Sequence, residues 1–400
     1  MEQKPLRIGL VVGEASGANL ALGMVQEILK LHPNAIIEGI GSEELIELGM
    51  HSLFDMNELS VMGLVEVLKQ LPRLLKVRKS IISHFLNNPP DVFIGVDAPD
   101  FNLAVETKLK EAGVPTIHYV SPTVWAWREK RIHKIGKATN LVLGVFPFEK
   151  QIYDKYGLAY KFVGHTMADN IAIDVDREKA KQDLNLDDSN YIAILPGSRA
   201  REIESLLSIF LETFSILRID NPDLKAIIPA VNTQREEQIH ELIANFQLSE
   251  EATSSLKNSY NKQALIDACV VTRKVAREVM IASDLVLLAS GTAALEAMLC
   301  KRPMVVAYKM SAITYMMMKR MYKPKYFSLP NILADELLVP ELLQDDVNPQ
   351  NLAKQLQNVW QVNYDDNQIV LDKFVAIHKT LKCNADKQAA IALLELAKAK

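Results

Sequence analysis

The feature that most constrains this chain is a repeated order of a short apolar run, a turn rich in glycine or proline, and a segment of helical periodicity. Alternation of this kind favours a parallel sheet with helices on both faces. Such sheets bind ligands beyond the carboxyl ends of their strands, so the turns after the runs are the places to search for chemistry. The runs predicted as strands lie at 7–12, 91–96, 116–120, 140–145, 191–195, 225–230, 284–288 and 304–308, and helices are expected at about 18–31 and 101–112.

The chain is 400 residues long, which is enough for two domains of ordinary size. The charged stretch 174–178 lacks apolar periodicity, and a second series of strands and helices begins after it. We therefore expect two doubly wound α/β domains that join near 165–185 and face one cleft. The segment 365–400 is rich in Ala, Leu and Lys, which predicts helices that need not stay with the second domain.

Composition excludes several other classes of protein. Apolar residues make up 49% and charged residues 24%, as in an average globular protein and unlike a disordered or collagen-like chain. The formal net charge of −4 argues against a general nucleic-acid binder, and the 3 cysteines are too few for a disulfide framework. No apolar run reaches the roughly eighteen residues of a membrane span, and none at the start has the form of a signal peptide. We expect a cytoplasmic protein that is dissolved or peripheral to a membrane.

The strongest candidate turn is 288–296, Leu-Ala-Ser-Gly-Thr-Ala-Ala-Leu-Glu. A predicted strand ends there, Ser290, Gly291 and Thr292 form a tight turn, and a helix follows. The unpaired N–H groups and the dipole of a helix N-terminus favour a diphosphate. Glu296, about one turn into the helix, is placed to accept hydrogen bonds from two ribose hydroxyls. The alternative is an ordinary helix capped by Ser290 or Thr292, with Glu296 in solvent.

A second turn, 196–202, also follows a predicted strand and opens a helix. An arginine at that place, Arg199 or Arg201, can form charge-assisted hydrogen bonds with a departing phosphate. The alternative is that both arginines are ordinary charges on a helix surface. Neither turn fits G-x-x-x-x-G-K-[ST], and no predicted strand leads into G-x-G-x-x-G, which argues against a P-loop ATPase and a dinucleotide-binding dehydrogenase.

Carboxylates follow two predicted strands in the first half of the chain. Asp97 and Asp100 flank an Ala-Pro pair, and a carboxylate at that point can act as a general base toward an alcohol. The alternative is a helix cap, for which Asp100 is better placed than Asp97. Glu14 and Ser16 follow the first predicted strand at an equivalent position.

The 8 histidines are scattered, and no H-x-x-x-H or C-x-x-C spacing occurs. The sequence therefore predicts no metal site, and nothing in it requires an organic cofactor. His118 lies inside the run 116–120, where a histidine held in the core is the simplest interpretation.

Three segments combine cations with apolar residues, at 69–79, 128–137 and 315–325. The second follows Trp125-Ala-Trp127, and the third places methionines beside lysine and arginine. Each of them alone is usually a helix with one face in the core and a solvated basic face. Three in a chain of negative net charge indicate charge segregation toward an anionic lipid surface or a lipid-like ligand.

A series of motifs runs through the chain from about residue 7 to residue 395. They are Gly-Glu-Ala-Ser-Gly (13–17), Val-Met-Gly (61–63) with Glu66, Asp-Ala-Pro-Asp-Phe-Asn (97–102), His-Tyr-Val-Ser-Pro-Thr-Val-Trp-Ala-Trp-Arg (118–128), Pro-Phe-Glu (147–149), Gly-His-Thr (164–166), Leu-Pro-Gly-Ser-Arg (195–199), Ala-Ser-Gly-Thr-Ala-Ala-Leu-Glu (289–296) and Ser-Leu-Pro-Asn (328–331). In this order they resemble the lipid-A-disaccharide synthase family, and the segment 119–127 is particularly specific. The family's first motif usually closes with Asp where this chain has Ala18, which removes a carboxylate from the start of a helix.

The resemblance implies a GT-B glycosyltransferase, an α/β enzyme of two Rossmann-like doubly wound domains facing a central cleft, which inverts the anomeric centre without a metal. It implies transfer of 2,3-diacylglucosamine from UDP-2,3-diacylglucosamine to 2,3-diacylglucosamine 1-phosphate, giving the β-1,6-linked lipid A disaccharide 1-phosphate and UDP. It also implies an enzyme of lipopolysaccharide biosynthesis, peripheral on the anionic cytoplasmic face of the inner membrane of a Gram-negative cell, and it is compatible with a homodimer.

The resemblance also assigns parts of the chain. It makes 1–170 an acceptor- and membrane-facing domain and 171–364 a UDP-sugar-binding domain, with 365–400 packing back on the first domain. Asp97 would deprotonate the acceptor's 6-hydroxyl, and Arg199 would counter the charge of the departing phosphate. The substrate-binding positions would be Ser290, Gly291, Thr292, Glu296 and Asn331 for the nucleotide sugar, together with Gly13, Glu14, Ser16 and Gly17 of the first motif.

Two other functions remain open from the sequence. A UDP-sugar epimerase or a different GT-B transferase keeps the fold, although such an enzyme would have little use for exposed basic and apolar helices. A non-catalytic protein that binds a nucleotide sugar or a lipid is a further alternative, supported only by the missing carboxylate at Ala18.

Overall fold

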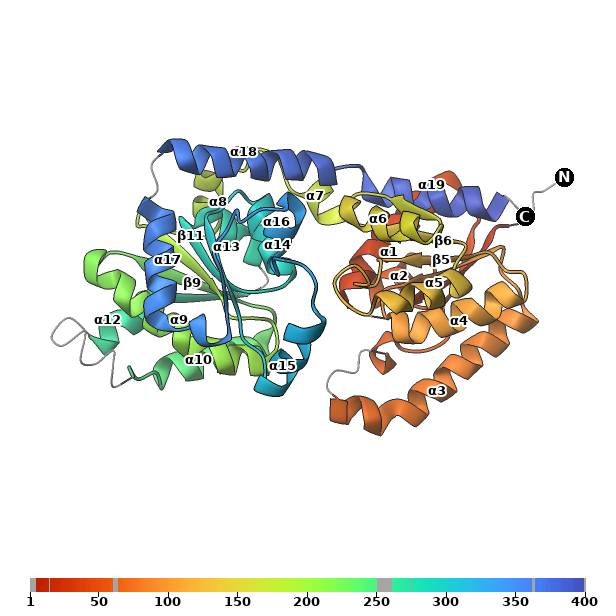
Figure 1. Ribbon diagram of the computed structural model, residues 1–400, viewed down its shortest axis with the longest axis horizontal. Coiled ribbons are helices and arrows are strands. Elements are labelled where there is room, and N and C mark those ends of the chain that lie inside the picture. Colours follow the sequence, from red (N-terminus) through yellow and green to blue (C-terminus); the bar gives the residue numbers. More distant parts are fainter. Residues whose placement is uncertain are drawn as a thin grey trace. The chain divides into compact units, whose positions relative to one another are not determined.

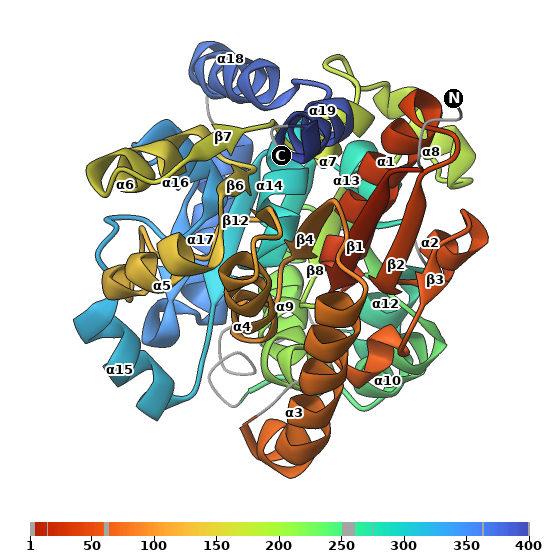
Figure 2. The same ribbon diagram turned by 90° about the vertical axis from the view of Figure 1, so that its right-hand side faces the viewer.

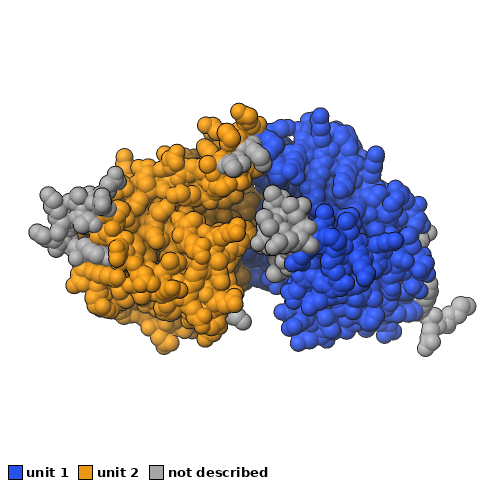
Figure 3. All heavy atoms as spheres, turned by 90° about the horizontal axis from the view of Figure 1, so that it is seen from below, with its two compact units in different colours: residues 1–170, 321–323, 380–400 blue, residues 171–320, 324–379 orange. Residues whose placement is uncertain are grey.

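The computed structural model describes residues 5–13, 15–59, 64–249, 261–273, 275–361 and 364–398. Two compact units divide the chain, as coloured in Figure 3. Unit 1 contains residues 1–170, 321–323 and 380–400, and unit 2 contains residues 171–320 and 324–379. The domain boundaries expected from the sequence, 1–170, 171–364 and 365–400, stay a prediction.

Unit 1 is built on a parallel sheet of seven strands in the order β3-β2-β1-β4-β5-β6-β7 (Figures 1 and 2). Strands with helices on both faces are apolar along their length, and every residue of β4 is buried. The strands are β1 (Arg7–Val12), β2 (Ile36–Ile40), β3 (His51–Ser52), β4 (Val92–Val96), β5 (Thr116–Tyr119), β6 (Leu141–Gly144) and β7 (Tyr160–Phe162).

The helices of unit 1 include one from the end of the chain, α19, which packs against α1 and α7 (Figures 1 and 2). The contact is close because α1 has a glycine there: a Cβ on Gly23 would lie 2.1 Å from Asp386 Oδ2. The helices are α1 (Ala15–Leu31), α2 (Glu43–Glu47), α3 (Leu64–Asn87), α4 (Pro99–Glu111), α5 (Ile132–Ala138), α6 (Lys150–Lys155), α7 (Thr166–Asn170) and α19 (Ala385–Lys398).

Unit 2 repeats this plan with a parallel sheet of six strands in the order β10-β9-β8-β11-β12-β13. The strands are β8 (Tyr191–Leu195), β9 (Lys225–Ala230), β10 (Cys269–Arg273), β11 (Leu285–Ala289), β12 (Met304–Tyr308) and β13 (Glu341–Leu343). The helices are α8 (Arg177–Asp183), α9 (Ala200–Asp220), α10 (Thr233–Ala244), α12 (Lys262–Asp267), α13 (Ala276–Ala282), α14 (Thr292–Leu299), α15 (Ala312–Met321), α16 (Leu329–Ala334), α17 (Pro349–Gln361) and α18 (Tyr364–Leu381), of which the last ends beyond residue 379.

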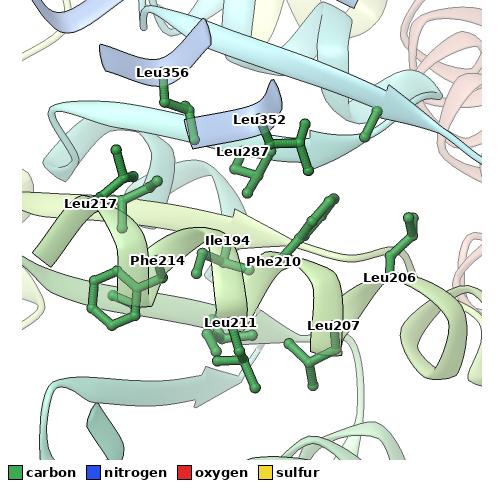
Figure 4. Close-up of a cluster of buried hydrophobic side chains, with 14 of the residues drawn as sticks. Ile194, Leu206, Leu207, Phe210, Leu211, Phe214, Leu217, Leu287, Leu352 and Leu356 are labelled. Carbon is green, nitrogen blue, oxygen red and sulfur yellow. The ribbon is translucent and has the colours of Figure 1, made fainter. Parts of the chain in front are cut away.

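The core of unit 2 lies between its sheet and the helices α9 and α17 (Figure 4). Phe210 and Phe214 of α9, one turn apart, are fully buried against strand residues such as Ile194. Leu352 of α17 closes the same cluster. Burying a side chain of this size stabilises the fold by about 1.5–3 kcal/mol. This packing therefore fixes the strands of unit 2, and with them the turns at the strand ends.

Both sheets have a topological switch point. In unit 1 the chain goes from β1 to β2 and β3 on one side, then returns to β4 beside β1 and continues on the other side. In unit 2 it does the same at β8 and β11. The turns after the two central strands diverge at such a point, and ligands bind in the space they leave. The turns concerned begin at Gly13 and Asp97 in unit 1, and at Pro196 and Ser290 in unit 2.

Each apolar run predicted as a strand is a strand, so the expected doubly wound parallel sheets are confirmed. The structure adds strands that the sequence did not predict, such as β2 and β10. Within the ranges that the structure describes, no helix has both the length and the apolarity needed to cross a bilayer.

Candidate functional site

The switch point of unit 1 brings together two of the predicted motifs. Val12 at the end of β1 is in register with Val96 at the end of β4, and the Gly13 N–H donates to the Val96 carbonyl at 3.3 Å. A Cβ on Gly17 would lie 3.4 Å from the Cβ of Asp97. The first motif and the Asp97 turn are therefore neighbours in the fold.

The Asp97 turn has an unusual backbone. Asp97 and Ala98 have φ of 55° and 41°, in the left-handed region that residues other than glycine rarely adopt. Local hydrogen bonds hold this conformation: Asp97 Oδ1 accepts from the Ala98 N–H at 2.8 Å, and Asn102 Nδ2 donates to the Asp97 carbonyl at 2.8 Å. Strain of this kind persists where the surroundings impose it, which is common at active sites.

A cavity of about 210 Å³ opens beside Asp97. Another residue in the left-handed region forms part of its wall, since Val120 has φ of 76° although it is β-branched. The lining consists of Asp97, Pro99, Val120, Ser121, Pro122, Thr123, Val124, Trp127, Arg128 and Arg131. The 118–128 motif therefore lines the cavity that contains the predicted base. The cavity as a whole combines a carboxylate, two arginines and an aromatic ring in one small space.

Buried polar groups support that wall from behind. Glu149 accepts hydrogen bonds from Tyr160 Oη at 2.9 Å and from the Phe146 N–H at 3.3 Å. Burial raises the pKa of Glu149 to about 8, against the lowering effect of these hydrogen bonds. Ser121 Oγ lies 2.8 Å from the hydroxyl of the buried Tyr153, which stacks on Tyr160. The loop that faces Asp97 is thus fixed to β7 and α6.

Two expectations about neighbouring residues have different outcomes. Asp100 is not a helix cap: α4 begins at Pro99 with Ala98 at the N-cap, and the exposed Asp100 carboxylate instead pairs with Arg131 at 2.5 Å. The cap was wrong because the left-handed turn starts the helix two residues earlier than expected. His118 is in the core as predicted, with Nδ1 at 2.7 Å from the buried Glu106.

The switch point of unit 2 places the other two predicted turns side by side. Leu195 of β8 is in register with Leu288 of β11. Because the carboxyl ends of neighbouring parallel strands meet at one edge of the sheet, the turn 196–199 lies next to the turn 290–292. Unit 2 therefore contains, on neighbouring turns, the arginine predicted to contact a phosphate and the turn at 290–292 predicted to bind a diphosphate.

The turn at 290–292 has free space around its glycine. Gly291 has φ 157° and ψ −155°, a region that glycine alone adopts readily, and a Cβ there would meet nothing within 4 Å. Gly291 is the N-cap of α14, without a side-chain cap, so the alternative of a helix capped by Ser290 or Thr292 is wrong. Gly291 and Thr292 at the start of this helix are exposed, so the helix N-terminus retains donors for an anion.

Glu296 is paired rather than free in solvent. Its Oε1 accepts from Arg277 Nε of α13 at 3.2 Å, and its side chain is 19% exposed. Sequence reasoning missed Arg277 because it lies 19 positions before Glu296 on another helix. This arginine orients the carboxylate that the sequence assigns to the ribose.

Arg199 is exposed at the N-cap of α9. Its Nη1 donates to Glu202 Oε1 at 3.1 Å, and Glu202 Oε2 accepts from the N–H groups of Ser198 at 3.1 Å and Arg199 at 3.4 Å. Gly197, with φ of 125°, is needed here because a Cβ would lie 2.5 Å from the Cβ of Glu202. The arginine is thus held at the switch point by a carboxylate of its own helix.

Asn331 is fully buried and holds a loop of unit 2. Its Nδ2 donates to the Val339 carbonyl at 2.9 Å and to Glu341 Oε2 at 3.0 Å, and its Oδ1 accepts from the N–H groups of Leu338 and Val339 at 2.8 and 2.9 Å. Both ends of the amide are therefore engaged within the unit. A direct contact with the nucleotide sugar stays a prediction.

Parts of the predicted site lie outside what can be described. Glu14 and the motif 61–63 fall outside the described residues, and so do the side chains of Ser16 and Glu66. Ala18 is 7% exposed and belongs to the core cluster of unit 1. Among the described residues, no group of three or more His, Cys, Asp or Glu side chains is arranged to hold a metal ion.

Comparison with known sequences gives matches over nearly the whole chain. The profile of a family described as lipid-A-disaccharide synthetase matches residues 8–393. A lipid-A-disaccharide synthase of Alteromonas mediterranea is 54% identical over 393 residues, covering 98% of both chains. The one of Haemophilus ducreyi is 48% identical over 393 residues, covering 97% of this chain and 96% of the relative.

Solved structures with similar folds are distant in sequence. A crystal structure of the glycotransferase of kitacinnamycin has a TM-score of 0.61 at 13% identity and covers 98% of this chain and 99% of its own. The UDP-GlcNAc 2-epimerase from Neisseria meningitidis bound to UDP-GlcNAc has a TM-score of 0.60 at 12% identity, covering 99% and 100%. At this identity the likeness is one of fold alone, and it confirms the expected GT-B class with its two Rossmann-like sheets.

Proposed function

Because this chain belongs to the lipid-A-disaccharide synthase family, it is a glycosyltransferase of lipid A biosynthesis, and we propose that its two switch-point turns bind the reacting ends of the two substrates. It transfers 2,3-diacylglucosamine from UDP-2,3-diacylglucosamine to 2,3-diacylglucosamine 1-phosphate with inversion, releasing UDP. The epimerase and the non-catalytic binding protein, which the sequence left open, are therefore wrong.

Asp97 is the general base of the proposed mechanism. Its carboxylate takes the proton from the acceptor's 6-hydroxyl while that oxygen attacks the anomeric carbon of the donor. The bond between the anomeric carbon and the diphosphate oxygen breaks on the opposite face, and UDP leaves. The observation that carries this proposal is the strained Asp97–Ala98 turn at the switch point, with a cavity at its side.

The donor's diphosphate is proposed to lie at Ser290, Gly291 and Thr292. Exposed N–H groups at the start of α14 and the helix dipole stabilise the charge that develops on the departing diphosphate. Arg199, on the neighbouring turn, adds a guanidinium, and Glu296, oriented by Arg277, accepts from the ribose hydroxyls. These groups supply the charge stabilisation that a metal supplies in other transferases.

The test of the base is Asp97→Asn. Asparagine tolerates the left-handed backbone and keeps the oxygen that accepts from the Ala98 N–H, so the turn is expected to survive while the base is lost. We expect disaccharide formation from the two diacylated substrates to fall by about a hundredfold or more, with unchanged far-UV circular dichroism and thermal midpoint. Asp154→Asn, an exposed carboxylate paired with Lys150 on α6, is the matched control. Near-normal turnover by Asp97→Asn would remove Asp97 from the mechanism.

We further propose that the enzyme binds peripherally to an anionic membrane on its cytoplasmic face. Leu71 and Leu75 on α3 are 41% and 44% exposed, and they lie near the exposed Lys76 and Lys79. Met316 on α15 is 58% exposed. Apolar side chains that enter the interface beside cations that attract anionic lipid are typical of peripheral binding. The predicted homodimer stays a prediction, and sedimentation in detergent would test it.

A further inference from the structure

A charged pocket lies next to the Asp97 cavity in unit 1. Its volume is about 830 Å³, and its lining consists of Asp100, Arg128, Glu129, Lys130, Arg131, Tyr156 and Lys323. Arg128 and Arg131 also line the smaller cavity that contains Asp97. The cations of this pocket therefore border the space where the acceptor's alcohol is proposed to react.

The acidic side chains of the pocket are already neutralised. Glu129 accepts from Lys155 Nζ at 2.5 Å and from Tyr156 Oη at 3.0 Å, and it also pairs with Lys323 Nζ. The hydrogen bonds from Lys155 and Lys323 lower the pKa of Glu129 to about 2. Asp100 pairs with Arg131 at 2.5 Å. An excess of positive charge remains on Arg128 and Lys130.

Arg128 is held in place without using its hydrogen-bonding edge. Its guanidinium carbon lies 4.2 Å from the centre of the Trp127 ring, and among the described residues no carboxylate forms an ion pair with Arg128 or Lys130. Trp127 is itself fixed, because its Nε1 donates to Thr123 Oγ1 at 3.0 Å. A stacked guanidinium keeps its N–H groups available for the paired oxygens of a phosphate.

The backbone also indicates a site rather than an ordinary surface. Arg128 has φ of 54°, so it shares the left-handed conformation of Asp97, Ala98 and Val120. Each such residue costs on the order of 1–3 kcal/mol, and three of the four, Asp97, Val120 and Arg128, line the smaller cavity. The segment that carries the arginine is bound to the connecting segment 321–323, since the Lys323 N–H donates to the Ala126 carbonyl at 3.0 Å.

We propose that this pocket binds the phosphate monoester of the acceptor, with Arg128 and Lys130 as its main contacts. The inference rests on the proposed function, because it takes the reacting alcohol to lie at Asp97. In the acceptor, the phosphate on C1 and the hydroxyl on C6 are on opposite sides of one hexose ring, so the phosphate site has to lie one sugar away from the base. Two adjoining cavities that share Arg128 and Arg131 meet this requirement.

The experiment compares two acceptors, 2,3-diacylglucosamine 1-phosphate and the same lipid with a 1-O-methyl group, in detergent micelles at saturating donor. We expect the wild-type chain to prefer the phosphate in kcat/KM by about tenfold to a hundredfold, the ratio that charge-assisted hydrogen bonds provide. In Arg128→Gln and Lys130→Gln this preference should shrink severalfold. The KM for the phosphorylated acceptor should rise several times more than the KM for the methylated acceptor, and the KM for the donor should stay unchanged.

Lys150→Gln is the control, because it removes an exposed cation of the same unit that pairs with Asp154 away from the pocket. It should keep the full preference. Inorganic phosphate should compete with the phosphorylated acceptor in the wild type and less in Arg128→Gln. If Arg128→Gln and Lys130→Gln lower kcat/KM equally for both acceptors, or if the wild type shows no preference, the phosphate does not bind here.

A membrane-surface role for the same cations gives a different result. In that case Arg128→Gln would weaken binding to anionic vesicles and leave the preference for the phosphate intact, which overturns the proposal. Failure of the proposed base is also distinguishable: an Asp97→Asn chain of normal turnover contradicts the base, whereas the preference between the two acceptors is measured in the wild type. Lys130→Gln is a second variant that is expected to fold normally, because Lys130 is exposed and its φ is not in the left-handed region.

Discussion

Gly13 and Ala98 meet at the switch point of unit 1 so closely that a Cβ on Gly13 would lie 2.1 Å from the Cβ of Ala98. Two carbons cannot approach to that distance, and neither belongs to a flexible side chain. Gly13→Ala therefore has to displace the Asp97–Ala98 turn. We expect it to destabilise unit 1 by about 1–3 kcal/mol. It should also lower kcat and change the KM for the acceptor less, because the base moves. Thermal denaturation and steady-state kinetics on the purified chain measure the two effects.

Ala98→Gly supplies the matching rescue. Ala98 is in the left-handed region, which glycine adopts without strain, and the substitution removes the carbon that the new methyl meets. The double variant Gly13→Ala/Ala98→Gly should recover most of the lost stability and turnover, with a coupling well beyond the additive sum. Additive losses would mean that Gly13 acts through some other contact.

Arg199 allows function and stability to be separated. The side chain is 61% exposed and its ion pair with Glu202 is a surface pair of the i,i+3 type, which contributes about 0–1 kcal/mol. Arg199→Ala should therefore change the thermal midpoint little, yet lower kcat by about a hundredfold, because the charge beside the departing diphosphate is lost. Lys179→Ala, which breaks the exposed pair with Asp183 on α8, is the control for the same unit. Equal losses of turnover and stability would make Arg199 a structural residue.

The sequence predicted the parts of this site that are local. Each strand–turn–helix boundary depends on residues within a few positions, so Asp97 and the turn at 290–292 could be placed at strand ends from periodicity and glycine alone. Their neighbours could not be predicted in this way. The Gly13 turn lies against the Asp97 turn because β1 pairs with β4, whose residues come 84 positions later in the chain. Only the three-dimensional fold decides such a pairing.

Strands at or next to the edges of the sheets were the main omissions. β2 contains Glu38 and Gly39, and β10 is only partly buried, so neither gives the continuous apolar run of a central strand. Partners of site residues were missed because they are distant in the sequence. Arg277, for example, contacts Glu296 from another helix. The burial of Glu149 could not be predicted either, because the residues around it in the sequence are typical of a helix start on the surface.

The buried Glu149 gives a prediction about pH. Its pKa is raised from an ordinary 4.5 to about 8 by burial, so between these values the unfolded chain loses a proton that the folded chain retains. Stability supplied by this group is thus fully present below pH 4.5 and is lost as the pH rises toward 8. Glu149→Gln removes the titration and keeps the neutral form. We expect the variant to gain stability relative to the wild type between pH 5 and pH 8.

Urea midpoints of both chains at the two pH values measure this difference. Glu111→Gln on α4, an exposed carboxylate paired with Lys108, is the control and should show the same pH dependence as the wild type. If the urea midpoints of Glu149→Gln and of the wild type change with pH in the same way, Glu149 is ionised in the folded chain. In that case the loop 121–125 would rest on a buried charge instead of a neutral carboxyl group.

The last prediction concerns membrane binding by α3. Leu71 and Leu75 lie one turn apart on the same face of the helix, and both are more than a third exposed. Transfer of each side chain into a lipid interface is favourable by about 1.5–3 kcal/mol at most. Leu71→Ser/Leu75→Ser should therefore weaken binding to anionic vesicles by about tenfold or more, while turnover of detergent-solubilised substrates changes little. Flotation with vesicles of anionic and of zwitterionic lipid measures the effect.

Leu86→Ser is the matched control, because Leu86 is 42% exposed on the last turn of the same helix, far along its axis from Leu71. Charge contributes separately: Lys76→Gln and Lys79→Gln should each cost about 1 kcal/mol of vesicle binding and flatten its dependence on salt. Binding that falls equally with Leu86→Ser would indicate a general loss of hydrophobicity. Binding that ignores both the leucines and the lysines would place the membrane contact elsewhere on the chain, with α15 and its exposed Met316 as the next segment to vary.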